Sequence, residues 1–336
     1  MKLSHRIVSW IIDAGLGAYI ALMLLRIILP AMIGYDAGTV GMVDMVIVIT
    51  CAVFLSTIGI ISKASLGQAF FMGSFPKGRD GTLTKHIGWL ALTVSILGGW
   101  IITDISPVEF LSAKGLDGAA RIFTALATPN FDIIGEALQA MVVTIFTALM
   151  ATIAAVPIAF LLGFPAARNI MNTSATERAV YTILRAVLNV ARSMEPIIWA
   201  IIFSVWVGIG PFAGMLALVV HTIASLAKQY SEQIEDVDDG PIEAISATGA
   251  TRIQVLWFAI VPQCVIPFLS FTIYRWDINV RMATIIGFVG GGGIGTLLTQ
   301  YQGLSKFHEV GTLIIIITLI VWLLDVTSAR IREALK

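Results

Sequence analysis

The feature that most constrains this chain is a series of apolar blocks, each about 20 residues long, that recurs along the whole sequence. A helix of about 20 apolar residues crosses the hydrocarbon core of a bilayer, and such a helix pairs its own backbone polar groups internally. The composition agrees, because 57% of the 336 residues are hydrophobic, 12% are charged and the mean hydropathy is +0.91. The sequence therefore predicts an all-α integral membrane protein.

The apolar blocks predict about eight spanning helices. They lie at 7–29, 42–62, 87–103, 136–164, 184–207, 211–230, 254–274 and 309–330. The first block follows a basic start, as a signal peptide would, but it is long, it contains Asp13 and Arg26, and no small-residue cleavage site follows it. We therefore expect this block to remain as a helix of the mature protein.

Basic residues are concentrated on one side of the predicted topology. An even number of spans places both termini on the same side, where the connecting segments carry Lys2, Arg6, Lys63, Lys77, Arg79, Lys85, Arg168, Arg178, Arg330, Arg332 and Lys336. Cytoplasmic segments of membrane proteins carry such an excess of Lys and Arg. We expect a multi-pass protein of the cell inner (plasma) membrane with both termini in the cytoplasm.

Several function classes are disfavoured by the sequence. Lys+Arg and Asp+Glu both number 21, so the charge gives no argument for a nucleic-acid partner. Cys51 and Cys264 lie inside apolar blocks, and the four histidines are scattered, so we expect no metal site. His221, alone in an apolar block, is expected to pack or to form a hydrogen bond. Neither Gly-x-Ser-x-Gly nor His-Glu-x-x-His occurs, and we expect this chain not to be an enzyme.

One connection on the predicted cytoplasmic side departs from the others. Between Lys228 and Arg252 the acidic residues outnumber the basic ones. Two interpretations of the acidic run at 232–239 stay open: a solvated connection, or a surface that faces something other than lipid.

A short polar helix is predicted directly after this acidic run. Pro241 suits the first position of a helix, Glu243 suits the third, where its carboxylate caps a free amide, and Gly249 suits the position just beyond the end. The predicted helix has about eight residues and a length of about 12 Å, which is too short to cross a bilayer. A helix of this length is also unstable alone in water, so we expect a partner to hold it.

The sequence EAISATGATRIQVLWFAIVP at 243–262 resembles the EAA loop of the permease subunits of type I ABC importers. The family pattern is Glu-Ala-Ala, three residues, Gly, nine residues, then Ile-x-Leu-Pro. The spacing is kept by Glu243, Ala244, Gly249 and Pro262. Three positions differ: Ile245 replaces the second Ala, Ala259 the Ile and Val261 the Leu.

The resemblance implies that the short helix docks into a groove on a cytoplasmic ATP-binding subunit and couples ATP-driven closure to the membrane helices. The implied coupling residues are Pro241, Glu243, Ala244, Ala247, Gly249 and Pro262. Small side chains at 244 and 247 permit close approach, and Gly249 can absorb a bend. Further implied partners are a dimer of ATP-binding subunits carrying ATP and Mg, a second copy of this chain, and an extracytoplasmic substrate-binding protein.

Two longer strings resemble the phosphonate branch of these permeases. They are PIIWAIIFSVWVGIGPFAGMLALVVHTIASLAKQYSEQIE at 196–235 and YRWDINVRMATIIGFVGGGGIGTLL at 274–298. The resemblance implies import of phosphonates or a related oxyanion such as phosphite. Because the first 130 residues carry none of these motifs, we predict an accessory region of about three transmembrane helices at 1–130 and a permease core of about five at 131–336.

Two alternatives for the function stay open. Within the same class, the solute is methionine or a quaternary amine. In a different class, the chain is an ion-coupled carrier or channel that works alone, which predicts discontinuous helices and an ionisable relay in paired halves. We find no internal repeat of that kind.

The glycine run VGGGGIGT is not a nucleotide-binding loop, because the Gly-Lys-Ser/Thr ending of a P-loop is missing. ATP must therefore bind to another polypeptide. Two roles for the run stay open, namely close helix packing across a permease dimer and a mobile turn beside the translocation path. The residues concerned are Gly290, Gly291, Gly292, Gly293 and Gly295.

Charged residues near two spans are candidates for the translocation path. Arg275 and Arg281 lie beyond the predicted end of the seventh span and could bind a dianionic phosphonate; alternatively, Arg275 pairs with Asp277 and both arginines extend to the interface. Arg192 and Glu195, near the inner half of the fifth span, either serve the path, pair with each other, or lie at the cytoplasmic interface.

Overall fold

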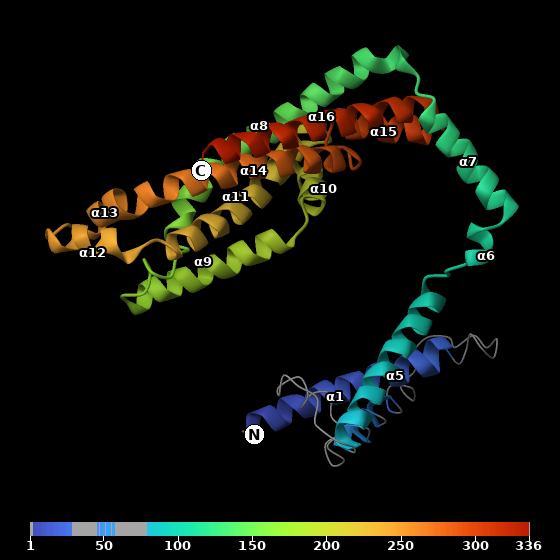
Figure 1. The fold of residues 1–336 in the computed structure, drawn as a ribbon, viewed down its shortest axis with the longest axis horizontal. Helices are drawn as coiled ribbons and strands as arrows, with labels where there is room; N and C mark the ends of the chain where they lie inside the picture. Colours follow the sequence, from blue (N-terminus) through green and yellow to red (C-terminus); the bar gives the residue numbers. More distant parts are fainter. Residues whose placement is uncertain are drawn as a thin grey trace. The chain divides into compact units, whose positions relative to one another are not determined.

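In the structure, a computed structural model, the described residues form helices joined by turns and loops, and no strand occurs among them. These are 3–28, 46, 48–50, 52–54, 56–57 and 79–335. The chain forms two compact units, Met1–Leu116 and Asp117–Lys336, which are considered separately. The predicted all-helical class is confirmed (Figure 1). The functional division into 1–130 and 131–336 remains a prediction.

The first unit contains α1 (Leu3–Met23), its π-helical continuation η1 (Leu24–Ile28), α5 (Arg79–Ile102) and the single turn α6 (Pro107–Phe110). The Tyr19 hydroxyl on α1 donates a hydrogen bond of 2.9 Å to Ser95 Oγ on α5. Apolar helical segments within the described side chains of this unit are Val8–Met23 and Gly88–Ile102. The predicted span at 42–62 lies largely outside the described residues.

The second unit begins within α7, at Asp117, and contains the helices of the later apolar blocks. Its elements are α7 (Ala113–Ala127), η2 (Phe131–Ile133), α8 (Ile134–Gly163), α9 (Ala175–Ser193), α10 (Pro196–Val207), α11 (Pro211–Glu235), α12 (Asp239–Ala247), α13 (Arg252–Val255), η3 (Leu256–Ile260), α14 (Val261–Gly287), α15 (Gly293–Gly303) and α16 (Phe307–Ala334). Within the described residues, four helical segments are long and apolar enough to cross a membrane: Phe131–Gly163, Pro211–Glu235, Arg252–Gly287 and Phe307–Ala334. The pair α9–α10 forms a fifth if it is counted as one broken span.

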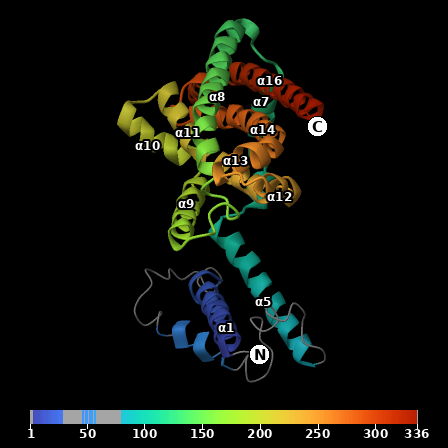
Figure 2. The ribbon, with the colours of Figure 1, turned by 90° about the vertical axis from the view of Figure 1, so that its left-hand side faces the viewer.

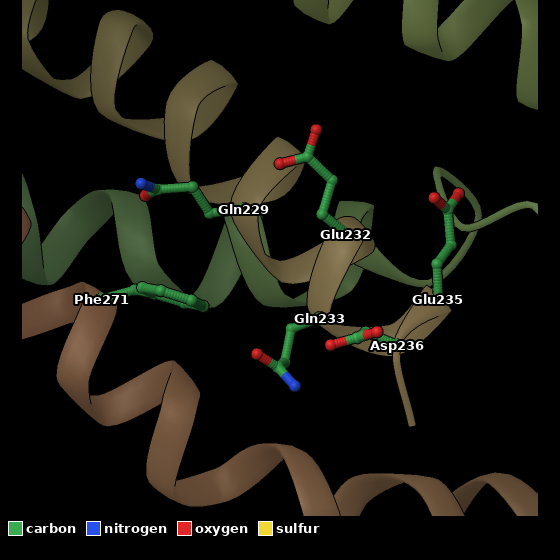
Figure 3. A pocket seen from close by; sticks show the side chains of 6 residues that line it. All are labelled: Gln229, Glu232, Gln233, Glu235, Asp236 and Phe271. Carbon is green, nitrogen blue, oxygen red and sulfur yellow. The ribbon is translucent and has the colours of Figure 1, made fainter. Parts of the chain in front are cut away.

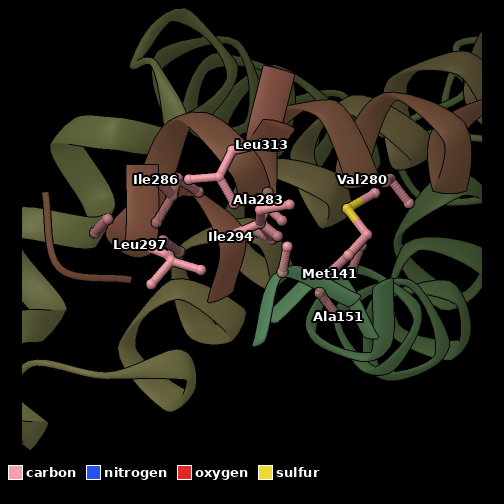
Figure 4. Packing of buried hydrophobic residues seen from close by; sticks show 13 residues of the cluster. Met141, Ala151, Val280, Ala283, Ile286, Ile294, Leu297 and Leu313 are labelled. Carbon is pink, nitrogen blue, oxygen red and sulfur yellow. The ribbon is translucent and has the colours of Figure 1, made fainter. Parts of the chain in front are cut away.

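The spanning helices of the second unit lie side by side (Figure 2), and small and medium apolar side chains form the core between them (Figure 4). Ala137, Ala148 and Ala151 on α8 are fully buried, which brings the neighbouring backbones close together. Larger side chains on the same helix, Phe146 and Ile153 among them, are exposed to the surroundings. Since a bilayer solvates such side chains, this distribution is the one expected of a membrane helix.

A buried polar cluster joins three of these helices. Asn279 on α14 donates from Nδ2 to Thr152 Oγ1 on α8 at 2.9 Å and to Thr222 Oγ1 on α11 at 3.0 Å. Thr222 Oγ1 lies 3.1 Å from Asn279 Oδ1. Asn279 and Thr222 are both fully buried. Because no water is available in the bilayer core, these groups must satisfy one another, and they hold α8, α11 and α14 in one register.

The predicted straight span at 184–207 is wrong. The structure has two helices there, α9 and α10, which meet at an angle of 90°. Met194 and Glu195 adopt extended backbone angles, and Pro196 begins α10. Proline lacks an N–H and disfavours helical geometry in the residue before it, so the Glu-Pro pair ends α9 and starts a new helix in a different direction.

The predicted span at 254–274 is too short. The structure extends it to Arg252–Gly287 through α13, the π-helical turn η3 and α14. Arg275, Asp277 and Arg281 therefore lie inside a long helix, whereas we expected them beyond its outer end. The short helix α15, which follows the glycine turn, was not predicted as an element of its own.

Candidate functional site

The short polar helix exists as α12, but it starts two residues earlier than predicted. Asp238 is the N-cap, and its carboxylate accepts a hydrogen bond of 3.1 Å from the Gly240 N–H. Pro241 is therefore the third helical residue, and the predicted capping role of Glu243 at N3 is wrong. Asp is a strong N-cap, and Pro241 is tolerated because first-turn amides lack an intrahelical partner in any case.

The predicted end of this helix is confirmed. The last helical residue is Ala247, and Gly249 follows with φ +81° while its N–H donates to the Ser246 carbonyl at 3.0 Å. A side chain at 249 would meet nothing within 4 Å, so glycine is required there by the backbone angle and not by space.

One face of α12 is anchored and the other is free. Ile242 packs against the apolar cluster at that end of the bundle, and the Asp238 N–H donates to Gln263 Oε1 at 3.0 Å. Pro241, Glu243, Ala244 and Ala247 are exposed. This helix thus presents a small, polar surface that is tied to the first turn of α14, where Pro262 lies directly after the π-helical turn η3.

A cavity of about 340 Å³ separates α12 from the segment at 169–173. Near it, Arg252 Nη1 lies 3.1 Å from Glu177 Oε1. Glu177 lies in the first turn of α9, and its carboxylate also accepts hydrogen bonds from the backbone amides of Ser174 and Thr173. The ion pair joins the start of α9 to the residue that begins α13.

The acidic run is not a simple solvated connection at its first residues. Glu235 Oε1 accepts from Arg185 Nη1 and from the Arg168 N–H, both at 2.7 Å. Glu232 Oε1 lies 3.5 Å from Lys228 Nζ. Together with Phe271 on α14, these acidic residues at the end of α11 line a cavity of about 500 Å³ (Figure 3). The acidic residues therefore tie α11 to α9 and to the segment before it.

The glycine run forms a tight turn between α14 and α15. Gly290, Gly292 and Gly293 have φ of +92°, +75° and +69°. Gly295 packs so closely against α14 that an added Cβ would lie 2.9 Å from the Gly287 Cα and would overlap the Thr284 carbonyl oxygen. These glycines thus permit close packing within one chain. Packing across a permease dimer remains a prediction.

The charged residues of α14 are arranged differently from our expectation. Asp277, which is 1% exposed, forms its ion pair with Arg281 one turn later and not with Arg275. Arg275 is 9% exposed, and its Nε has no hydrogen-bond partner among the described residues. A buried guanidinium with an unpaired N–H is costly, which makes Arg275 the candidate path residue that most needs a partner.

The structure brings Arg275 together with the other path candidates at the break between α9 and α10. Arg192 is in the last turn of α9 and Glu195 is the N-cap of α10, and both are exposed. His221 on α11 precedes Thr222, whose hydroxyl is hydrogen-bonded to Asn279, one turn after Arg275 on α14. His221 Nδ1 lies 3.2 Å from the Met194 carbonyl oxygen, which confirms the expected hydrogen bond.

The chain was compared with known proteins. Residues 159–336 match the family described as "Binding-protein-dependent transport system inner membrane component". The chain is 33% identical over 254 residues to the phosphite transport system permease protein PtxC of Stutzerimonas stutzeri, covering 75% of this chain and 90% of that protein. It is 31% identical to the phosphate-import permease protein PhnE of Mycolicibacterium smegmatis, covering 73% of this chain and 45% of the relative.

A solved structure has a similar fold. The inward-facing MetNI methionine ABC transporter superposes with a TM-score of 0.50 and 21% identity, covering 61% of this chain and 96% of that chain. At this identity the likeness concerns the fold alone.

Proposed function

Because the chain belongs to the family of binding-protein-dependent transport system inner membrane components, we propose that it is the permease through which phosphonates, phosphite or a related phosphorus oxyanion enter the cell. The chain is the multi-pass inner membrane permease of an ABC transporter, and it holds no cofactor. ATP is hydrolysed by a separate ATPase subunit, and an extracytoplasmic binding protein is its other partner. The solute branch is supported by the identity of 33% to a phosphite permease along three quarters of this chain.

We assign the coupling to the ATPase subunit to α12. This helix is exposed on the face that carries Glu243, Ala244 and Ala247, and its other face is anchored by Ile242. It is joined to the long α14 helix through Gln263, whose side chain contacts the backbone of Asp238. A force applied to α12 by closing ATPase subunits would therefore reach α14 directly, as alternating access between two states requires.

In this arrangement both termini are cytoplasmic, two copies of the chain form the pathway and two ATPase subunits lie beneath them. Arg168, which precedes α9, and Arg178, in its first turn, support the assignment of that side, because cytoplasmic segments are rich in Lys and Arg. The residues at 1–130 form an accessory membrane region in this proposal.

The proposal is tested by co-purifying the full chain with its ATPase subunits and its binding protein, reconstituting the assembly in liposomes and measuring the ATPase rate. We expect stimulation by phosphite, methylphosphonate or phosphate, and none by methionine. Stimulation of the ATPase by methionine alone would support the assignment as an importer and contradict the assignment of phosphorus oxyanions as its solutes. The broken span α9–α10 is one feature expected of a carrier that works alone. Family membership favours the importer instead. Stable binding of the ATPase subunit to the permease distinguishes the two, because a carrier that works alone would not bind it.

A further inference from the structure

The break between α9 and α10 lies beside the middle of α11. His221, whose Nδ1 contacts the Met194 carbonyl at the break, is ten residues along α11 from Pro211, or about 15 Å at the rise of an α-helix. That distance is about half of the hydrocarbon thickness of a bilayer. Discontinuous helices in transporters place solute sites at this depth, because the backbone and the ends of the two half-helices are free to meet a ligand.

The charges around the break favour an anion. Arg192 at the end of α9 and the buried Arg275 on α14 contribute two positive charges, and Glu195 at the start of α10 contributes one negative charge. Arg275 is nine-tenths buried, and its Nε lacks a hydrogen-bond partner within the described part of the chain. Arg281 does not share this role, because it is paired with Asp277 and its side chain is 46% exposed. With a neutral His221, the break carries a net positive charge that a monoanion would balance.

His221 adds a preference among anions. A carbonyl oxygen only accepts hydrogen bonds, so the Nδ1–H of His221 is the donor to Met194. In the neutral ring Nε2 then carries no proton and can accept one hydrogen bond. A singly charged phosphite, phosphate or phosphonate has a P–O–H group that can donate this bond. Sulfate at neutral pH has no such proton.

We propose that the break between α9 and α10 binds a tetrahedral phosphorus oxyanion in preference to sulfate, with Arg275 and Arg192 as its cationic ligands and His221 as an acceptor for its hydroxyl. This inference rests on the proposed function, whose solute class it shares. It places a solute site within the permease itself, in addition to the one on the binding protein.

The test uses the complex of the full permease with its ATPase subunits, without the binding protein. The thermal unfolding midpoint is measured against rising sodium phosphite, and against sodium sulfate at matched ionic strength. We expect phosphite to raise the midpoint of the wild type and sulfate to leave it unchanged. The loss of charged hydrogen bonds to the anion should weaken binding, so Arg275→Gln should raise the phosphite concentration that gives a half-maximal shift of the midpoint by about 10- to 100-fold. Arg275→Lys keeps the positive charge and should retain part of the shift.

Arg192→Gln is the second variant, because Arg192 is exposed and its loss leaves the packing of the bundle intact. Arg330→Gln, also at an exposed arginine, is the matched control and should respond like the wild type. A wild type without a phosphite-dependent shift, an equal shift with sulfate, or unchanged responses in both Gln variants would overturn the inference. If the complete assembly nevertheless takes up phosphite, the proposed function is supported and only the solute site at the break is contradicted. If the complete assembly takes up no phosphorus oxyanion, the proposed function is contradicted as well.

Discussion

The contact between α14 and α15 predicts opposite effects for two glycine-to-alanine substitutions on the same short helix. In Gly295→Ala the new methyl group would lie 2.9 Å from the Gly287 Cα and overlap the Thr284 carbonyl oxygen. These are backbone atoms, so no side chain can rotate away and the two helices must separate. Overpacking of this kind costs about 1–3 kcal/mol. In Gly303→Ala the methyl group would meet nothing within 4 Å, and alanine is a better helix former than glycine by roughly 0.5–1 kcal/mol.

The free energy of unfolding is measured by SDS titration of the purified permease, with the fluorescence of its eight tryptophans as the signal. We expect Gly295→Ala to be less stable than Gly303→Ala by about 2–4 kcal/mol, with Gly303→Ala at or slightly above the wild type. Equal stabilities for the two variants would refute the close contact between α14 and α15.

The structure supports three further predictions. Asn279→Leu removes three buried hydrogen-bond contacts that each contribute about 0.6 kcal/mol in a membrane protein, so SDS titration should show a loss of stability of about 2 kcal/mol. A double-mutant cycle of Asn279→Leu with Thr222→Val should show coupling between the two residues, and additive effects would contradict the cluster. Glu243→Arg and Gly249→Val should leave the permease folded and lower ATP-driven uptake at least about tenfold. The second substitution forces a β-branched residue to φ +81°. Normal uptake in both variants would contradict the assignment of the coupling helix. Glu177→Gln weakens the ion pair with Arg252 and the acceptor of the Ser174 and Thr173 amides, so SDS titration should show a small loss of stability. A stability equal to that of the wild type would show that the carboxylate contributes nothing.

The long apolar blocks were predictable because the requirement to span a bilayer leaves few alternatives. The helices α8, α11 and α16 lie where continuous apolar sequence predicted them, and Gly249 ends α12 as a C-terminal glycine should. Hydrophobicity cannot show where a helix bends, so α9 and α10 were predicted as one span although the Glu195-Pro196 pair carried the signal for a break.

Other features depend on pairing between distant residues. The span that contains α14 was predicted too short because Arg275 and Asp277 look like the end of an apolar segment, and only the folded chain shows that both are buried. The ion pair between Arg185 and Glu235 joins residues that are 50 positions apart, and no local pattern reveals it. The start of α12 was predicted two residues late because Pro241 was placed at the first helical position, whereas Asp238 is the N-cap and its N–H contacts Gln263, 25 residues away.

The most direct test of the central claim is ATP-driven solute uptake into proteoliposomes that contain the full permease, its ATPase subunits and its binding protein. The proposal that this chain is the permease for phosphorus oxyanions predicts accumulation of phosphite, phosphate or a phosphonate that requires both ATP and the binding protein. Methionine should not accumulate. Accumulation of methionine in place of any phosphorus oxyanion, or uptake of an oxyanion that proceeds without ATP, would contradict the proposal.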